Sequence, residues 1–252
     1  RVAGTLGSDA FRLSTEGGVD IAAGPFDKLA LDFRLLRPSA LTEGFAGSGI
    51  GADIVLDGAF AAPAIDYRLA AQRLSLGPVT LFDLAAKGVS RREQDVVIIP
   101  ADVRAARVAG IDAAAGGPLT DVSLTGTFAL EGDRLLTDDL RLVSRRIDAR
   151  GTVLANFAQG RYSGSVDGRL DDYRIESVGM FEVGAGLDLT AGSDGDFAVR
   201  GRVRTRSQRI VNEGLRDFLG GEAVAASDIV YTSDGRLRLS DLQVRAPELE
   251  IT

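Results

Sequence analysis

The chain has 252 residues, a formal net charge of −7, 31 glycines, and neither cysteine nor histidine. Without cysteine it forms no disulfide and offers no thiolate, and without histidine it lacks the commonest general base and metal ligand. Acidic and basic residues are mixed throughout and no extended basic face stands out, which argues against nucleic acid as a partner.

Short alternating runs separated by glycine-rich turns dominate the chain from its beginning. Leu29, Leu31, Phe33 and Leu35 share one face of an expected strand. This period of two predicts strands with one apolar and one polar face. No apolar run approaches the ~18–20 residues of a membrane-spanning helix.

The stretch 121–154 shows the alternation most clearly. Val122, Leu124 and Phe128 alternate with hydroxyl side chains, and Gly126 takes the remaining place on the apolar side. Turns are predicted at 131–133, 192–195 and 233–235, where glycine and aspartate supply positive φ. Successive hairpins of this kind form a meander.

Parts of the sequence recur at unequal spacing. The pattern Asp, apolar, any, apolar, any, Gly, any, apolar begins at Asp53, Asp121 and Asp196. A longer echo aligns residues 133–148 with 235–250 without gaps, including an Asp-Leu pair in each. Unequal spacing indicates a quasi-repeat of hairpins with variable loops rather than a solenoid. We predict an all-β fold for residues 1–252, as a single elongated repetitive segment of a longer chain.

One segment, residues 205–219, breaks the pattern. Its apolar residues have helical spacing, Thr205 with Gln208 fits a capping box, and Gly220-Gly221 supplies a stop. We therefore expect one short helix over 205–219, at an end or edge of the sheet.

Motifs for cofactors, metals and catalysis have ordinary explanations. Residues 47–52 fit a dinucleotide-binding Gly-x-Gly-x-x-Ala, but a strand pattern follows where that motif needs a helix. Residues 192–196 resemble part of a calcium-binding turn, but a hairpin turn is the favoured explanation. The acid pairs Asp138-Asp139 and Asp171-Asp172 are expected at or near turns, as solvated loop carboxylates without a glycosidase dyad. We predict no catalytic residue, metal or cofactor; an enzyme on a β scaffold is the least favoured function.

Three passages carry a family resemblance. They are Gly126-Thr127-Phe128 through Gly151-Thr152-Val153, the helix ending at 215–221, and residues 235–249. Together they resemble the repetitive β segments of the TamB family, within the wider AsmA-like group. The resemblance implies a taco-shaped β groove in the periplasm of a Gram-negative bacterium, an inner-membrane anchor outside this segment, and an outer-membrane assembly partner (TamA-like). It also implies phospholipid transport between the two membranes and a role in outer-membrane protein insertion.

The hypothesis is that the alternating apolar residues line a hydrophobic groove for phospholipid acyl chains. The alternative for each residue is an ordinary core position. A rival function is a scaffold that assembles outer-membrane proteins by strand addition. The groove candidates are Ile54, Leu56, Phe60, Val122, Leu124, Phe128, Leu140, Leu142, Ile147, Val153, Phe197, Val199, Val203, Leu242, Val244, Leu249 and Ile251.

Overall fold

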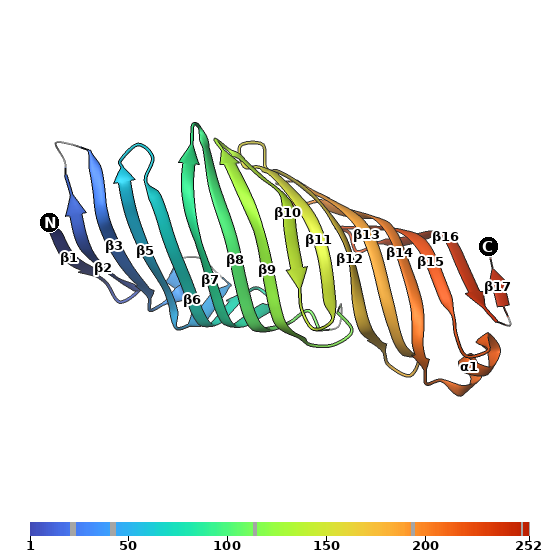
Figure 1. Cartoon of the computed structure of the whole chain (residues 1–252). Coiled ribbons are helices and arrows are strands. Elements are labelled where there is room, and N and C mark those ends of the chain that lie inside the picture. Colours follow the sequence, from blue (N-terminus) through green and yellow to red (C-terminus); the bar gives the residue numbers. More distant parts are fainter. Residues whose placement is uncertain (21–23, 41–43, 113–114, 193–194, 248, 252) are drawn as a thin grey trace. The chain divides into compact units, whose positions relative to one another are not determined.

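The chain forms curved, open, antiparallel β-sheet with one short α-helix (Figure 1). This computed structural model describes residues 1–20, 24–40, 44–112, 115–192, 195–247 and 249–251, excepting the side chains of 250 and 251. The all-β prediction is confirmed. The chain divides into two compact units, residues 1–111 with 118–132, and residues 112–117 with 133–252.

The first unit is an antiparallel meander in which β3 pairs with β5, and β4 and β5 both pair with β6. Its strands are β1 (Val2–Gly7), β2 (Phe11–Val19), β3 (Pro25–Leu35), β4 (Phe45–Ser48), β5 (Ile50–Ala59), β6 (Ala64–Leu76), β7 (Val79–Glu93), β8 (Val96–Ala109) and β9 (Leu119–Glu131), with a 3-10 turn at Pro38–Ala40.

The second unit is a meander of the same kind. Its strands are β10 (Arg134–Val143), β11 (Ile147–Asn156), β12 (Arg161–Ile175), β13 (Gly179–Ala191), β14 (Phe197–Ile210), β15 (Val224–Thr232), β16 (Leu237–Ala246) and β17 (Leu249–Ile251).

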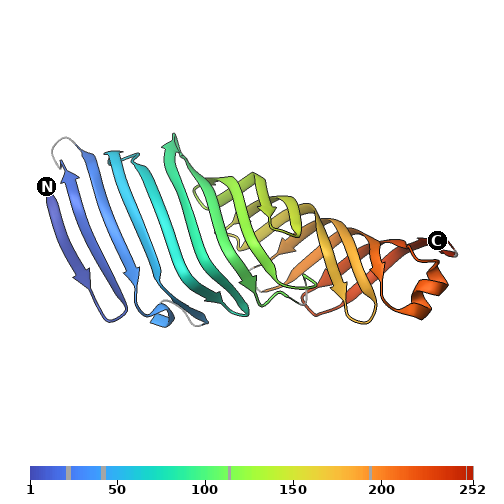
Figure 2. The same ribbon diagram turned by 60° about the horizontal axis from the view of Figure 1, so that its bottom comes forward.

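The helix is shorter than predicted and begins later. Thr205 and Gln208 lie in β14, and α1 (Glu213–Leu219) follows that strand (Figure 2, orange, beside the C-terminal strands). The predicted capping box is wrong, because alternate pairing of residues 198–206 with β13 and β15 outweighs the helical spacing. Asn212 caps the helix by accepting a 2.9 Å hydrogen bond from the Leu215 amide. The predicted stop is correct, since Gly220 adopts φ 74°.

The acid pairs do not lie in turns, so that prediction is wrong. Asp138-Asp139 lies at a register shift within β10, and Asp171-Asp172 at one within β12. Asp172 adopts φ 54°, a left-handed conformation that aspartate tolerates better than most residues. These bulges bend long strands where the sequence suggested their ends.

The predicted turns and the longer echo are found in the structure. Gly132 has φ 54° and Gly235 has φ 78°. In the turn at 192–195 the Gly195 amide donates to the Gly192 carbonyl at 3.4 Å, while Ser193 and Asp194 lie outside the described residues. Both halves of the echo form a hairpin, β10 with β11 and β16 with β17, and each first strand is irregular at its Asp-Leu pair.

The buried core is small. Half of the buried apolar side chains are alanines, and much of the apolar surface of both units remains partly exposed. A sheet with one apolar face normally buries that face against a second layer. Across the described residues, the buried apolar side chains are Leu35, Ala71, Ala105, Val108, Ala115, Leu119, Ala149, Ala155, Ile210 and Leu219.

Candidate functional site: the apolar face of each sheet

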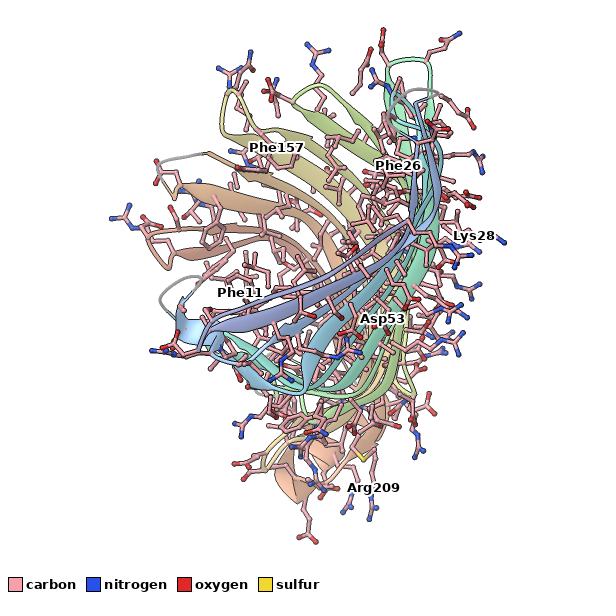
Figure 3. All side chains as sticks on the ribbon, turned by 90° about the vertical axis from the view of Figure 1, so that its left-hand side faces the viewer. Phe11, Phe26, Lys28, Asp53, Phe157 and Arg209 are labelled. Carbon is pink, nitrogen blue, oxygen red and sulfur yellow. The ribbon has the colours of Figure 1, made fainter. Side chains whose placement is uncertain are left out.

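The strand registers decide which face each side chain occupies, because residues directly opposite in an antiparallel pair project to the same side. In the first unit Phe11 and Phe26 point to the inner side of the curve (Figure 3). Lys28 points to the outer side, which carries many charged side-chain ends (Figure 3). The inner face of this unit is therefore the apolar one.

All six groove candidates of the first unit lie on this inner face. Ile54 is opposite Leu31, and Leu56 is opposite Leu29. Phe60 packs against Phe26 with ring centroids 4.6 Å apart. The remaining three face apolar residues of β8 in the pairs Val122–Ala105, Leu124–Val103 and Phe128–Ile99.

One row of this face can be followed from β9 back to β3. Leu124 is opposite Val103, which is opposite Ala86. The row continues through Leu69, Ala52 and Phe33. Large and small apolar side chains thus share the row, and the alanines leave room above the sheet.

In the second unit, the described side chains of the candidates also share one face. The row through Leu142 runs over Ala149, Gly168 and Ala185 to Val203. Other rows of that face join Val153 to Val199, and Ile147 to Val244. The strand registers also place the remaining candidates of this unit. Leu140 is opposite Gly151, Phe197 is opposite Ala191, and Leu249 is opposite Ala246. Leu242 is next to Gln243, which lies on the other face, and Ile251 is opposite Val244, although the side chain of Ile251 lies outside the described residues.

Exposure distinguishes this face from a closed core. Nearly all candidates with described side chains are half-buried, and none is fully buried. Phe60 is 39% exposed and Leu242 50%. Within each unit, no second sheet or long helix among the described residues covers the apolar face. The geometry is that of an apolar surface with space above it, which suits an elongated apolar ligand.

The opposite face of the first unit carries a ladder of charges. Asp32, Asp53, Arg68, Lys87 and Asp102 follow one another across β3, β5, β6, β7 and β8. Arg34 lies 2.6 Å from Asp32 and 3.0 Å from Asp53, and Lys87 lies 3.6 Å from Asp102. Exposed pairs of this kind contribute little stability each. They mark the solvated side of the sheet.

Several residues of the inner face were not among the candidates. Phe11 stacks on Phe33 with ring centroids 6.0 Å apart, and Tyr67 lies in the row between Ile54 and Gly88. The Tyr67 hydroxyl donates a hydrogen bond to the Pro100 carbonyl. Burial raises the pKa of the Tyr67 hydroxyl above its ordinary value. The same alternation that identified Ile54 would have identified these residues.

The glycine motif at 47–52 is followed by a strand, as predicted. Residues 47–52 belong to β4, β5 and the bend between them, where Gly49 has φ 62°. In the part of the chain that is described, no three acidic side chains gather as a metal-binding group. Among the described residues, no helix is long and apolar enough to cross a membrane.

Comparisons with known proteins identified no relative of this chain. No family model, curated protein or solved structure matches the chain.

Proposed function

We propose that this chain is a segment of a TamB-like protein that shelters phospholipid acyl chains on the apolar faces of its curved sheets. One observation carries the proposal: apolar residues chosen by alternation share one face in each unit, and that face stays half-exposed. An aliphatic surface without a covering layer remains in contact with water. An apolar ligand that covers the surface removes it from water, which is favourable.

The free energy gained by burying an acyl chain is large enough for binding. Burying a ~16-carbon acyl chain at ~0.8 kcal/mol per methylene would contribute roughly 10 kcal/mol. Gly168 and Ala185 lie together along one row, between Leu142 at one end and Val203 at the other, which leaves space for an acyl chain against the sheet. The charged outer face keeps the protein in water while the inner face holds lipid.

The cellular setting follows from the family resemblance and is part of the same proposal. The segment would lie in the periplasm of a Gram-negative bacterium, anchored to the inner membrane elsewhere in the protein. It would work with a TamA-like outer-membrane partner and carry phospholipid between the membranes.

Neighbouring positions on β14 provide a direct test. Val199 lies on the apolar face, opposite Leu189, whereas Arg200 lies on the other face, opposite Asp188. A photocrosslinking amino acid at 199 should capture phospholipid in cells, and the same group at 200 should not. Equal capture at both positions, or capture at neither, would refute the assignment of the lipid to the apolar face.

A second candidate function is strand addition to an outer-membrane protein during assembly. The chain forms an open antiparallel sheet, and the edge strand of an open sheet offers backbone groups to an incoming strand. Crosslinks from strand backbones to an unfolded barrel substrate, without lipid capture at 199, would favour this function.

A further inference from the structure

The outer face of the second unit carries a row of arginines along one strand. Arg200, Arg202, Arg204 and Arg206 occupy alternate positions of β14, about 6.6 Å apart. Their partners across the sheet include Gly186 for Arg202 and Gly184 for Arg204. Arg209, further along this strand, points away from the sheet (Figure 3).

The two glycines open a hollow beside the arginines. It measures about 390 Å³ and is lined by Asp167, Gly168, Gly184, Ala185, Gly186, Arg202 and Arg204. A side chain at Gly184 would meet no atom within 4 Å. A glycine inside a strand weakens the strand, and such a residue often marks a place where a ligand approaches the backbone.

Hydrogen-bonding capacity remains unused at this hollow. The Arg202 Nε is buried and has no partner, although the same guanidinium lies 3.5 Å from Asp228. Arg204 has no hydrogen-bond or ion-pair partner among the described residues. Buried donors without partners are rare, and a bound group that accepts a hydrogen bond would satisfy this one.

Charge is distributed unevenly around the hollow. The row through Gly184 is flanked by Arg169 on β12 and Arg204 on β14. Asp167 stands at the neighbouring row, where a Cβ on Gly186 would lie 3.3 Å from its carboxylate. Arg169 pairs with Asp171 at 3.2 Å, so its charge is shared. The basic end of the hollow is therefore at Gly184.

We propose that this hollow is an oxyanion site that binds a phosphate group through Arg202 and Arg204. The planar guanidinium fork suits phosphate oxygens, and a charge-assisted hydrogen bond would satisfy the Arg202 Nε. The site lies on the face opposite Val203 and Ala185, and it does not depend on the acyl-chain proposal. The phosphate can come from a lipid headgroup or from a free phosphate.

Calorimetric titration of the full chain with inorganic phosphate, and separately with a short-chain phosphatidic acid, tests the site. We expect saturable binding of at least one probe. Arg204→Gln should weaken it about tenfold or more, and Gly184→Leu should abolish it by filling the hollow. Arg238→Gln is the matched control, because Arg238 faces Val230 on the same side of the sheet, away from the hollow.

The two probes identify the source of the phosphate. Similar affinities, both lost in Gly184→Leu, would mean that the phosphate itself is recognised. Binding of phosphatidic acid alone, also lost in that variant, would assign the site to a headgroup. Absence of saturable binding, or binding that survives both Arg204→Gln and Gly184→Leu, would overturn the proposal. Circular dichroism of each variant confirms that it is folded.

Discussion

Tyr67 and Gly88 face each other on neighbouring strands, and the Tyr67 hydroxyl reaches past the glycine to the Pro100 carbonyl on the next strand. A Cβ on Gly88 would overlap both that carbonyl oxygen and the tyrosine ring. The aromatic ring thus covers the space that a glycine leaves open in the sheet. On the inner face of the first unit, a large side chain thus packs over a glycine on the neighbouring strand.

Replacing Gly88 should destabilise the first unit. We expect Gly88→Ala to cost about 1–3 kcal/mol, because the sheet has no space for the new methyl group. The measurement is urea unfolding followed by circular dichroism. Gly184→Ala is the control: its methyl group would enter open space, and the change should be neutral or stabilise by about 0.5 kcal/mol. Equal losses in both variants would show that Gly88 is not crowded.

Arg146 should hold the irregular segment of β12 in place. Its guanidinium donates to the carbonyls of Asp171 at 3.1 Å and Asp172 at 2.6 Å, and to Ala115 at 3.0 Å. We expect Arg146→Ala to lower the unfolding free energy by about 2–4 kcal/mol, because several half-buried carbonyls lose a charged donor. Arg146→Lys should recover part of the loss, since it keeps the charge but not the fork.

The exposed Arg238 supplies the matching control for that measurement. Arg238→Ala should change the unfolding free energy by less than about 0.5 kcal/mol. Hydrogen exchange should also accelerate at residues 171–174 in Arg146→Ala. Unchanged exchange there would mean that the bulge is held by its backbone pairing alone.

The start of the helix provides a third test. Asn212→Ala should cost about 1 kcal/mol, because the Leu215 amide loses its acceptor. Thr205→Ala should leave helix content unchanged, since Thr205 lies within β14. Helix content measured by NMR chemical shifts at residues 213–219 distinguishes the two. A loss of helix in Thr205→Ala would revive the longer helix over 205–219.

The hairpin between β15 and β16 should be sensitive to acid. The Thr232 hydroxyl donates to Asp234 at 2.6 Å and, with the Arg236 amide, lowers the pKa of that carboxyl. A lowered pKa in the folded state gives stability that is present above the unfolded pKa and is lost as pH falls through the folded pKa. In an NMR titration, Thr232→Val should raise the Asp234 midpoint. An unchanged midpoint would exclude the hydroxyl as the cause.

The alternation of apolar and polar residues was sufficient to predict which face of the sheet a residue occupies, but not where a strand ends. It placed Val122, Leu142 and Val199 on apolar faces because a period of two depends on pleating alone. It placed the acid pairs at 138–139 and 171–172 in turns, because aspartates interrupt the pattern in the same way in a turn and in a bulge. Distinguishing the two requires knowing the partner strand.

The predicted start of the helix was wrong for a related reason. Residues 205–210 satisfy both a helical spacing and an alternation, and long-range pairing with β13 and β15 decides between them. The arginine row on β14 was visible in the sequence, but the hollow beside it depends on Gly184 and Gly186 of β13 being in register. That register depends on how β13 and β14 pair across the turn that joins them, which local patterns do not report.

A charge on the apolar face should block lipid binding without unfolding the sheet. Leu142 and Val199 are half-buried, so the arginine of Leu142→Arg or Val199→Arg can extend its charged end to water. We expect the thermal midpoint of each variant to stay within a few degrees of the parent, with bound phospholipid reduced severalfold. Unfolding of both variants would indicate a closed core instead.

Native mass spectrometry of the chain, purified from a bacterial envelope without harsh detergent and with lipid extraction alongside, shows whether the apolar faces hold lipid. We expect phospholipid bound at a defined stoichiometry, and its loss in Leu142→Arg and Val199→Arg. A mass without lipid, together with slow hydrogen exchange throughout both units, would refute lipid binding, because the apolar faces would then be closed by the protein itself.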